Sequence, residues 1–392
     1  MQFGLTETQQ TLKNTVRKFL AAECPIAEVR KQMETEAAFD AGLWRKMADQ
    51  GWTGIIFPEA YGGFGMGMVE MAAALEEMGR ALLPGPFFST VLLAGTVVEQ
   101  AGNEQQKEKY LGAVCRGEAR ATLALLEDSA SWSPDAVKMN ASGLLLTGRK
   151  LFVPDAGVAD FLVCAARMDG DLALFVVPSG ARGLQITPSP SIDGTRKLYE
   201  VSFESVPVEL LAQGSAARAA LNRALDIATV ALVAEMTGGM QRLLEIAVEY
   251  AKTRKQFGRP IGEFQAVQHQ CADMLLYTES SRSAAYYAAY ALQENIPEAH
   301  LAVSVAKVYA SDAYREVGNR AIQVHGGMGF TWENDAHLYY RRAKASELAL
   351  GDAAFHRERI AKAVVDGQRA SEERETVLAA DEPHMAFGHP GE

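Results

Sequence analysis

The sequence has few cysteines and no apolar run long enough to cross a membrane. Its four cysteines, Cys24, Cys115, Cys164 and Cys271, are spread over 392 residues, which excludes a dense disulfide framework and a clustered metal-ligand pattern. We therefore expect free thiols in a reducing compartment. The N-terminal residues also lack the basic start and apolar core of a signal peptide, so the expected location is cytoplasmic.

Positive charge is scarce as well. The chain has 38 Lys and Arg against 49 Asp and Glu, for a formal net charge of -11. Binding to nucleic acid depends largely on clustered Lys and Arg that neutralise phosphates, so this balance argues against a nucleic-acid partner. With 48% hydrophobic and 22% charged residues, the chain is long enough for two or three domains around a well-buried core.

Helical periodicity dominates both ends of the chain, and a β-type segment separates them. Near the N-terminus, Leu12, Val16, Phe19 and Leu20 recur at helical spacing, which predicts a helical bundle. The middle segment has short β-type runs with no helices between them, which predicts a small β-barrel or sandwich and disfavours a parallel dinucleotide-binding sheet. The expected strands are 121–126, 144–147, 161–165, 172–177 and 199–203.

Long helical patterns return in the third segment and give the chain a helix, strand, helix order. They cover residues 216–253, 265–291 and 298–324, and a last helix begins near Asp352. The expected division is an N-terminal helical domain at 1–118, a middle β domain at 119–212, a C-terminal helical domain at 213–366 and a polar, mobile tail at 367–392.

Two motifs in the third segment suit a nucleotide ligand. The run Arg254-Lys-Gln-Phe-Gly-Arg-Pro-Ile-Gly-Glu-Phe-Gln places a planar guanidinium at a helix-to-loop junction beside an aromatic ring, an arrangement that suits a pyrophosphate and an adenine. The second motif is Gln323-Val-His-Gly-Gly, and its His325 is interpreted as a structural hydrogen-bonding residue. Read singly, the arginines could be solvated charges and the glycines a helix stop; the two motifs together favour a ligand site.

These motifs and the three-part order resemble the acyl-CoA dehydrogenase family. The loop Phe57-Pro-Glu-Ala-Tyr-Gly-Gly resembles the family's Pro-Glu-x-Tyr-Gly-Gly turn, and residues 83–87 and 329–333 resemble the smaller-subunit type of bacterial degradative members. The resemblance extends to about residue 366. It implies a mixed α and β fold, FAD as cofactor, an acyl-CoA substrate, an electron-transfer flavoprotein as acceptor, and a homotetramer or a heterotetramer with a homologous subunit.

The resemblance also assigns residues to FAD. It implies that Arg254 binds the FAD pyrophosphate of a neighbouring subunit and that glycines after Gln323 let backbone approach the adenosine closely. In the β domain, the segment that contacts the flavin edge in relatives reads Leu151-Phe152-Val153-Pro154-Asp155 here, and Pro154 offers neither a hydroxyl nor an N–H. The implied cofactor-binding residues are Arg254, Phe257, Phe264, Gln265, Gln323, Gly326, Gly327 and Phe152.

Such an enzyme needs a carboxylate to remove the weakly acidic α-proton, and this chain has no carboxylate at the positions that the family uses. The commonest base position in the family falls at Leu350, and a second position used by some members falls at or near Ala228. Glu235, further along the same helix face among small residues, is one candidate base, with a buried ion pair to Arg242 as the equal alternative. Asp352 is the other candidate, although helix capping would explain it more simply.

Two functions follow from the resemblance. The first is an FAD-dependent dehydrogenase that forms a 2,3-enoyl-CoA by α-proton abstraction and β-hydride transfer, on a branched, cyclic or carboxylated acyl-CoA because the base is displaced. The alternative is a non-catalytic subunit that completes the FAD site of a homologous partner. Flavin-dependent monooxygenation is a third possibility that no sequence feature favours.

Overall fold

The computed structural model describes residues 4–365, so the tail predicted at 367–392 lies outside the described residues. The chain begins with a series of helices, and the first of them packs against α4, whose residues are buried along nearly its whole length. The first helix starts at a capping box in which the Thr6 hydroxyl accepts a hydrogen bond from the Gln9 backbone N–H. These helices are α1 (Glu7–Glu23), α2 (Ile26–Met33), α3 (Ala41–Asp49), α4 (Met68–Arg80), α5 (Thr96–Ala101) and α6 (Glu104–Cys115).

The sequence missed one element of this part. Residues 83–86 lie outside any helix, and Phe87 leads directly into a π-helix, η3 (Phe88–Gly95), all of whose residues are buried and which no sequence pattern predicted. Short 3-10 turns occur at η1 (Trp52–Gly54) and η2 (Glu59–Tyr61), on either side of the Pro-Glu-x-Tyr-Gly-Gly loop's start. A Cβ at Gly63 would overlap with the Phe57 carbonyl, so the loop requires glycine there.

The middle part consists of two four-stranded sheets, in agreement with the predicted barrel or sandwich. One sheet has the order β1-β4-β5-β8 and the other β2-β3-β7-β6. The sequence predicted five of these strands and missed the short or polar ones, β2, β6 and β8. The strands are β1 (Ala121–Ala124), β2 (Ala141–Ser142), β3 (Leu145–Pro154), β4 (Phe161–Met168), β5 (Asp171–Pro178), β6 (Leu184–Ser189), β7 (Leu198–Pro207) and β8 (Glu209–Gln213).

The first sheet lies between two hydrophobic cores, which explains its continuous apolar strands. Along β4, Leu162 and Cys164 point into the core shared by the two sheets, whereas Val163 and Ala165 point into the helical core. Successive strand residues face opposite sides of a sheet, so both faces of this sheet are buried. The middle part is therefore tied to the helices by direct packing.

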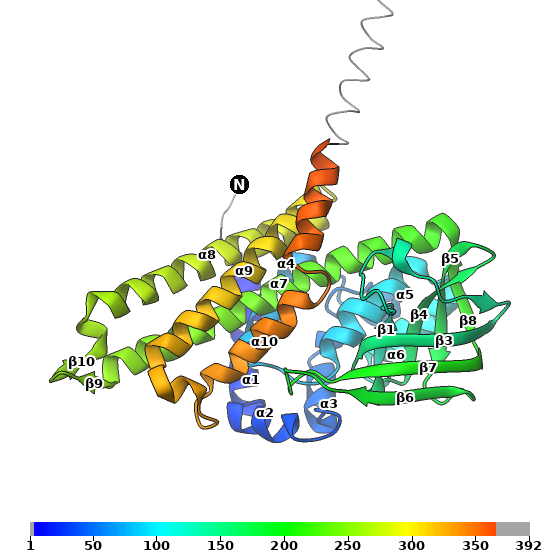
Figure 1. Cartoon of the computed structure of the whole chain (residues 1–392). Coiled ribbons are helices and arrows are strands. Elements are labelled where there is room, and N and C mark those ends of the chain that lie inside the picture. Colours follow the sequence, from blue (N-terminus) through cyan, green and yellow to red (C-terminus); the bar gives the residue numbers. More distant parts are fainter. Residues whose placement is uncertain (1–3, 366–392) are drawn as a thin grey trace, which may run out of the picture.

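The C-terminal part is a bundle of long helices that lies beside α4 (Figure 1). Its helices are α7 (Gly214–Thr253), α8 (Gln265–Gln293), α9 (Ala299–His325) and α10 (Ala336–Leu348), and a last helix starts at residue 353. Helices α4 and α7 cross with their backbones in contact, since a Cβ at Gly79 would overlap with the Glu235 carbonyl and one at Gly238 with the Glu76 carbonyl. A small hairpin, β9 (Lys255–Gln256) and β10 (Arg259–Pro260), projects at the end farthest from the sheets (Figure 1).

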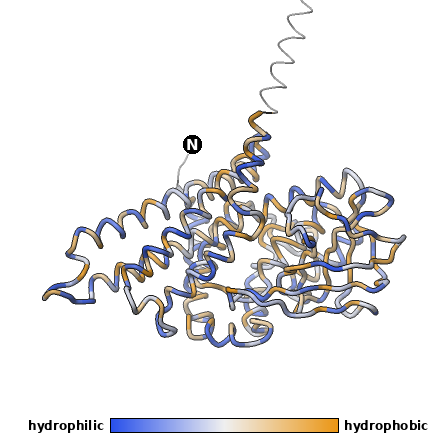
Figure 2. Tube along the Cα trace, viewed as in Figure 1, coloured by the Kyte–Doolittle hydropathy of each residue, from blue (hydrophilic) through white to orange (hydrophobic). Residues whose placement is uncertain are grey.

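Polar and apolar residues alternate along most of the helices and strands (Figure 2), as expected for elements with one face in a core. None of the four cysteines, all of which lie among residues 4–365, is paired. Within the same residues, no helix combines the length and the apolar character needed to span a bilayer. The predicted domain boundaries stay a prediction; in the structure α6 ends at Cys115 and α7 begins at Gly214.

Candidate active site

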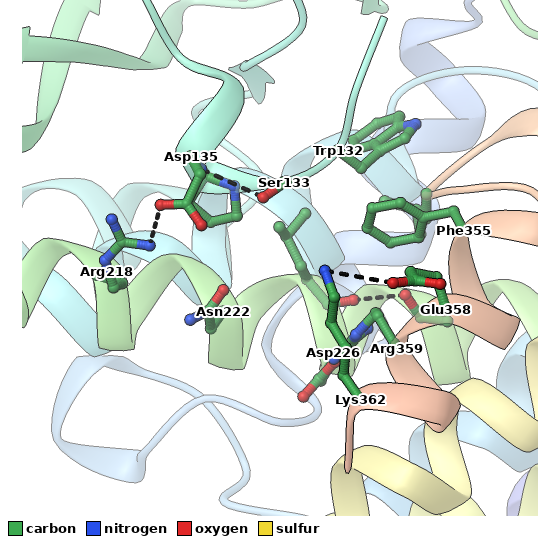
Figure 3. Close-up of a pocket in the computed structure, with 14 residues that line it drawn as sticks. Trp132, Ser133, Asp135, Arg218, Asn222, Asp226, Phe355, Glu358, Arg359 and Lys362 are labelled. Atoms are coloured by element: carbon green, nitrogen blue, oxygen red, sulfur yellow. Dashed lines mark hydrogen bonds and ion pairs between the residues drawn. The ribbon is translucent and has the colours of Figure 1, made fainter. Parts of the chain in front are cut away.

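A cleft of about 300 Å³ opens where the loop before β2, helix α7 and the last helix meet (Figure 3). Its wall combines apolar surface from Trp132, Leu350 and Phe355 with charged side chains that project into it. The polar residues from α7 recur at helical spacing on one face of an otherwise buried helix. The full lining is Trp132, Ser133, Pro134, Asp135, Arg218, Asn222, Leu225, Asp226, Thr229, Leu350, Phe355, Glu358, Arg359 and Lys362.

Each cation of the cleft lies beside a carboxylate. Arg359 holds the buried Asp226 at 2.8 Å, and this pair is the best shielded of the three. The sequence interpretation missed Asp226, although the polar stripe along α7 would have pointed to it. The pairs are Asp135–Arg218 at 2.7 Å, Asp226–Arg359 at 2.8 Å and Glu358–Lys362 at 3.6 Å (Figure 3). The Asp135–Arg218 and Glu358–Lys362 pairs are exposed and contribute little, so their cations can exchange partners with an anionic ligand at small cost.

Leu350, at the family's usual base position, lines the cleft, and its backbone is in the left-handed region with φ 59°. That conformation costs a non-glycine residue about 1 kcal/mol. His356 holds it, since its Nε2 donates to the Leu350 carbonyl oxygen at 2.9 Å and its Nδ1 lies 3.3 Å from the Ser304 hydroxyl. Burial lowers the pKa of His356 to about 4, so the ring stays neutral.

Lys307 also stabilises the turn that carries Leu350. Its buried Nζ donates to the carbonyl oxygens of Ser346 and Glu347, both at 3.1 Å, and to the Ser311 hydroxyl at 3.0 Å. These bonds satisfy carbonyls at the end of α10 that have no partner within the helix. Burial lowers the pKa of Lys307 to about 7. The turn that presents Leu350 to the cleft is thus held by two buried basic side chains.

The second base position, Ala228, is fully buried on α7, and the candidate Glu235 lies beyond it in the interior. Glu235 is 6% exposed and forms a buried ion pair with Arg196, whose guanidinium stacks 4.7 Å over the Phe88 ring. The prediction that Arg242 would be the partner of Glu235 was wrong, because the Arg242 guanidinium lies 3.5 Å from the Glu245 carboxylate instead. The buried ion pair itself was anticipated, but its partner comes from a loop far away in the sequence.

Asp352 is exposed and caps the last helix. Its Oδ1 accepts a hydrogen bond from the Phe355 backbone N–H at 2.8 Å, which confirms the capping alternative. Glu235 and Asp352 both belong to the described residues, and neither is among those that line the cleft. Their catalytic role stays a prediction.

The first nucleotide motif forms the projecting hairpin and its flanks. Arg254 and Gln265 are exposed, Phe257 is 92% exposed, and the chain turns at Phe257 with φ 53°. The Arg259 guanidinium lies 4.2 Å over the ring of Phe264, which is half-buried. Cations and aromatic faces are therefore presented outward from this end of the molecule.

The second motif reaches the same end. The rings of Tyr250 on α7 and His325 on α9 stack at 4.5 Å, which places the residues after each helix next to one another. His325 is buried, and its Nδ1 lies 2.7 Å from the Ala321 carbonyl oxygen, in agreement with its structural interpretation. Gln323 is exposed, and a Cβ at Gly326 or Gly327 would meet nothing within 4 Å, so a ligand can approach this backbone.

This end of the molecule fits the nucleotide half of FAD. It offers an exposed guanidinium from Arg254, aromatic faces from Phe257 and Phe264, and open backbone at Gly326 and Gly327. Guanidinium groups pair with phosphates, and aromatic faces stack on bases. The donor set therefore matches a dinucleotide, and its position at a tip suits a ligand held mainly by another subunit.

Phe152 does not join these residues within one chain. It belongs to β3, in the sheets at the opposite end of the molecule from the β9–β10 hairpin (Figure 1). Phe152 is 46% exposed with φ 52°, beside an irregularity in the pairing of β3 with β7. The implied FAD residues thus form two sets on different elements of the chain.

The polar groups near Phe152 are already engaged. The Pro154 carbonyl oxygen accepts from the Thr122 hydroxyl at 2.5 Å. Glu127, in the loop after β1, is held by the buried Lys150 at 2.7 Å and by the Met139 backbone N–H at 3.0 Å. This strand end can pack against a flavin ring but offers it few free donors.

Comparison with known proteins identifies the family of both helical parts of the chain. The family model "Acyl-CoA dehydrogenase, N-terminal domain" matches residues 6–118, and "Acyl-CoA dehydrogenase, C-terminal domain" matches residues 217–365. The chain is 31% identical to acryloyl-CoA reductase (NADH) of Anaerotignum propionicum over 93% of this chain and 96% of that protein. It is 32% identical to acyl-CoA dehydrogenase IpdE2 of Mycobacterium tuberculosis over 87% of this chain and 92% of that protein.

Among solved structures, the fold is similar to a chain in the crystal structure of the ChsE4-ChsE5 complex from Mycobacterium tuberculosis. The TM-score is 0.85 with 29% sequence identity, and the match covers 93% of this chain and 99% of that chain. The similarity therefore includes the middle sheets, which neither family model covers.

Proposed function

Because the chain belongs to the acyl-CoA dehydrogenase family, FAD-dependent oxidoreductases that act on CH–CH bonds, we propose that it is one subunit of a heteromeric enzyme that forms a 2,3-enoyl-CoA. Its main task in that assembly is to complete the FAD site of its partner. The observation that carries the proposal is the apolar side chains at both implied base positions, Ala228 and Leu350, in a chain that keeps most of the residues implied to bind the nucleotide exposed. Neither side chain can accept a proton.

The cleft supports binding of an acyl-CoA. Side chains of Arg218, Arg359 and Lys362 retain 42%, 33% and 69% exposure, so they are available to the phosphates of CoA. The apolar wall from Trp132 and Phe355 can cover the pantetheine and exclude water. The acyl group is expected to be branched, cyclic or carboxylated, since a displaced base requires a differently oriented thioester.

The chemistry divides between cofactor and protein. FAD, when bound, accepts the hydride from the β-carbon, and an electron-transfer flavoprotein is the proposed acceptor of the electrons. The role of this chain is to place Arg254 on the pyrophosphate and Phe257 beside the nucleotide of the neighbouring subunit. Two observations support a shared site: Arg254 follows helix α7 beside the β9–β10 hairpin whereas Phe152 lies on β3 in the middle sheets, and the fold is similar to a structure described as a complex of two proteins.

A self-sufficient dehydrogenase is the alternative, and the position of Asp226 favours it. This carboxylate lies on the cleft wall, two residues before Ala228 on α7. It would act as a base only after Arg359 had turned to the substrate. Glu235 and Asp352 are the other candidates, and each would have to leave its present partner.

One purification separates the two functions. The chain is expressed alone and with a homologous acyl-CoA dehydrogenase subunit, and the visible spectrum, FAD content and native mass are recorded for each. A colourless chain that joins a yellow, active complex is the expected result. A yellow homo-oligomer with one FAD per chain that reduces a dye with acyl-CoA would overturn the heteromeric proposal in favour of the alternative.

A further inference from the structure

The middle part contains a buried carboxyl group, that of Asp155, which has no role in the proposed reaction. Asp155 directly follows β3, is 3% exposed, and has a left-handed backbone with φ 51°. Its Oδ2 lies 2.7 Å from the Ser89 hydroxyl of η3, whereas its Oδ1 has no hydrogen-bond partner within the part of the chain that the structure describes. A buried carboxylate oxygen without a donor is costly, so the ionised form is poorly accommodated.

The contacts of the Ser89 hydroxyl indicate that the Asp155 carboxyl group carries a proton. Its Oγ lies 2.7 Å from Asp155 Oδ2 and 3.1 Å from the Pro86 carbonyl oxygen. A hydroxyl has a single hydrogen, and a carbonyl oxygen only accepts, so Ser89 cannot donate to both. Both contacts are satisfied if Asp155 donates to Ser89 and Ser89 donates to Pro86.

The charge balance around Asp155 leads to the same protonation state. Asp193 and Glu235 are matched by Arg342 and Arg196, with which they form buried ion pairs. An ionised Asp155 would add an uncompensated negative charge to this group. The ionisable groups that face Asp155 are Arg196 in the loop between β6 and β7, Arg342 on α10, Glu235 on α7 and Tyr199 on β7.

Asp155 is also the last of three anchors on the segment that ends β3. The Pro154 carbonyl accepts from Thr122, and the Asp155 backbone N–H donates to the Lys197 carbonyl at 2.9 Å. The Asp155 side chain adds the link to η3. Phe152 lies three residues earlier in this segment, and the family resemblance implies that it contacts the flavin.

We propose that Asp155 is a positioning residue that carries a proton, donates it in a hydrogen bond to Ser89, and thereby sets the strand end that presents Phe152 to the flavin. The flavin part of this inference rests on the proposed function; the protonation part does not. Burial raises the pKa of Asp155 to about 6, with Arg196 and Arg342 opposing the rise.

The first test concerns protonation and uses the chain without added flavin. An aspartate whose pKa is raised in the folded state contributes to the stability of the fold. This contribution is complete below the pKa of the unfolded chain, near 4, and is lost as the pH rises through the folded pKa of about 6. Asp155→Asn keeps a neutral donor in nearly the same shape. The unfolding equilibrium constant of the wild type, relative to Asp155→Asn, should rise about tenfold per pH unit between about pH 4 and pH 6. Parallel curves would overturn the proposal.

The second test concerns positioning and uses whichever assembly binds FAD. Asp155→Ala and Ser89→Ala should weaken FAD binding at least tenfold and shift the flavin absorption bands, whereas Asp155→Asn should stay within threefold of the wild type. Asp169→Asn is the matched control, because Asp169 is exposed in the same sheets and also has a left-handed backbone, φ 53°.

The results separate this inference from the proposed function. Equal FAD affinity in Asp155→Ala, Asp155→Asn and the wild type would overturn the positioning role. If the wild type binds no FAD in any assembly, the proposed function and the positioning role both fail, and the pH comparison still decides the protonation of Asp155.

Discussion

At the scale of single residues, the carboxylates of this chain differ in how their charge is balanced. Glu235 is paired with Arg196 inside the protein and Asp226 with Arg359 at the cleft wall, whereas Asp352 accepts a hydrogen bond from the Phe355 backbone N–H at the surface. A general base must be free to take a proton at the moment of reaction. Each of these groups already has a stabilising partner, which is why the base is proposed to come from elsewhere.

Replacement of either candidate base should leave turnover intact, and only the Glu235 variant should lose stability. Glu235→Gln leaves Arg196 buried without its counter-charge and is expected to lower the free energy of unfolding by about 3 kcal/mol. Asp352→Asn keeps a good cap and should leave stability unchanged. Denaturant unfolding and acyl-CoA-dependent flavin reduction are measured for both variants. Loss of turnover with stability retained in either variant would instead identify the base within this chain.

The buried histidine behind Leu350 should make stability depend on acidity. The pKa of His356 is lowered to about 4 in the folded chain, against about 6.5 when unfolded. Its contribution is therefore complete above pH 6.5 and is lost as the pH falls to about 4, by up to about 3 kcal/mol. Subtraction of the curve for His356→Gln from that of the wild type isolates this effect from the opposite one at Asp155. A pH-independent difference would contradict the prediction.

At the scale of elements, the hairpin between α7 and α8 is the part most clearly built for a ligand outside its own chain. Two short strands project Phe257 and keep Arg254 exposed at their base, with no contribution to the core. By contrast, the turn between α10 and the last helix is held by buried groups and presents Leu350 to the cleft. One element is arranged to donate contacts, and the other to shape a wall.

The hairpin can be tested by reversal of a single charge. Arg254→Glu should weaken FAD binding by the assembly at least tenfold, because it removes charge-assisted hydrogen bonds to phosphate and adds repulsion. Lys255→Glu makes the same charge change at the neighbouring exposed position and is the control. Affinity is measured by FAD release, and stability by thermal unfolding, which neither variant should change. Equal effects of the two variants would indicate a general electrostatic influence instead of a specific contact.

At the scale of the whole molecule, the two sets of implied FAD residues lie in different parts of the fold, one around the β9–β10 hairpin and one in the middle sheets (Figure 1). A cofactor shared in this way links binding to assembly, because a ligand that contacts two subunits stabilises only their complex. The cleft lies at the junction of the middle segment and the C-terminal segment, so it depends on their correct packing. Cofactor binding and oligomerisation are therefore expected to be one equilibrium.

Dilution of the purified assembly should reveal this linkage. FAD fluorescence, which is measured as cofactor leaves the protein, is expected to rise over the same concentration range in which native mass spectrometry detects dissociation into subunits. Excess free FAD should shift both transitions to lower protein concentration. Monomers that retain FAD after dissociation would contradict a shared site.

Much of this protein could be read from local sequence patterns. Helical periodicity predicted α7, α8 and α9 to within a few residues, because amphipathic spacing is a local property. The motifs at Arg254 and Gln323 were found for the same reason. Strands β6 and β8 and the π-helix at Phe88–Gly95 were missed, since the first two are short with mixed polarity and the last has no periodicity of its own.

The sequence by itself determined the helix, strand, helix order, the family and the two motifs proposed to bind a nucleotide, all of which depend on residues close together in the chain. Only the tertiary structure decided which charges meet. Arg196 reaches Glu235, Arg359 reaches Asp226, and Ser89 reaches Asp155 across separations that no local pattern encodes. Burial then determines which of these groups keep their charge, because the cost of an unpaired charge depends on the surrounding packing.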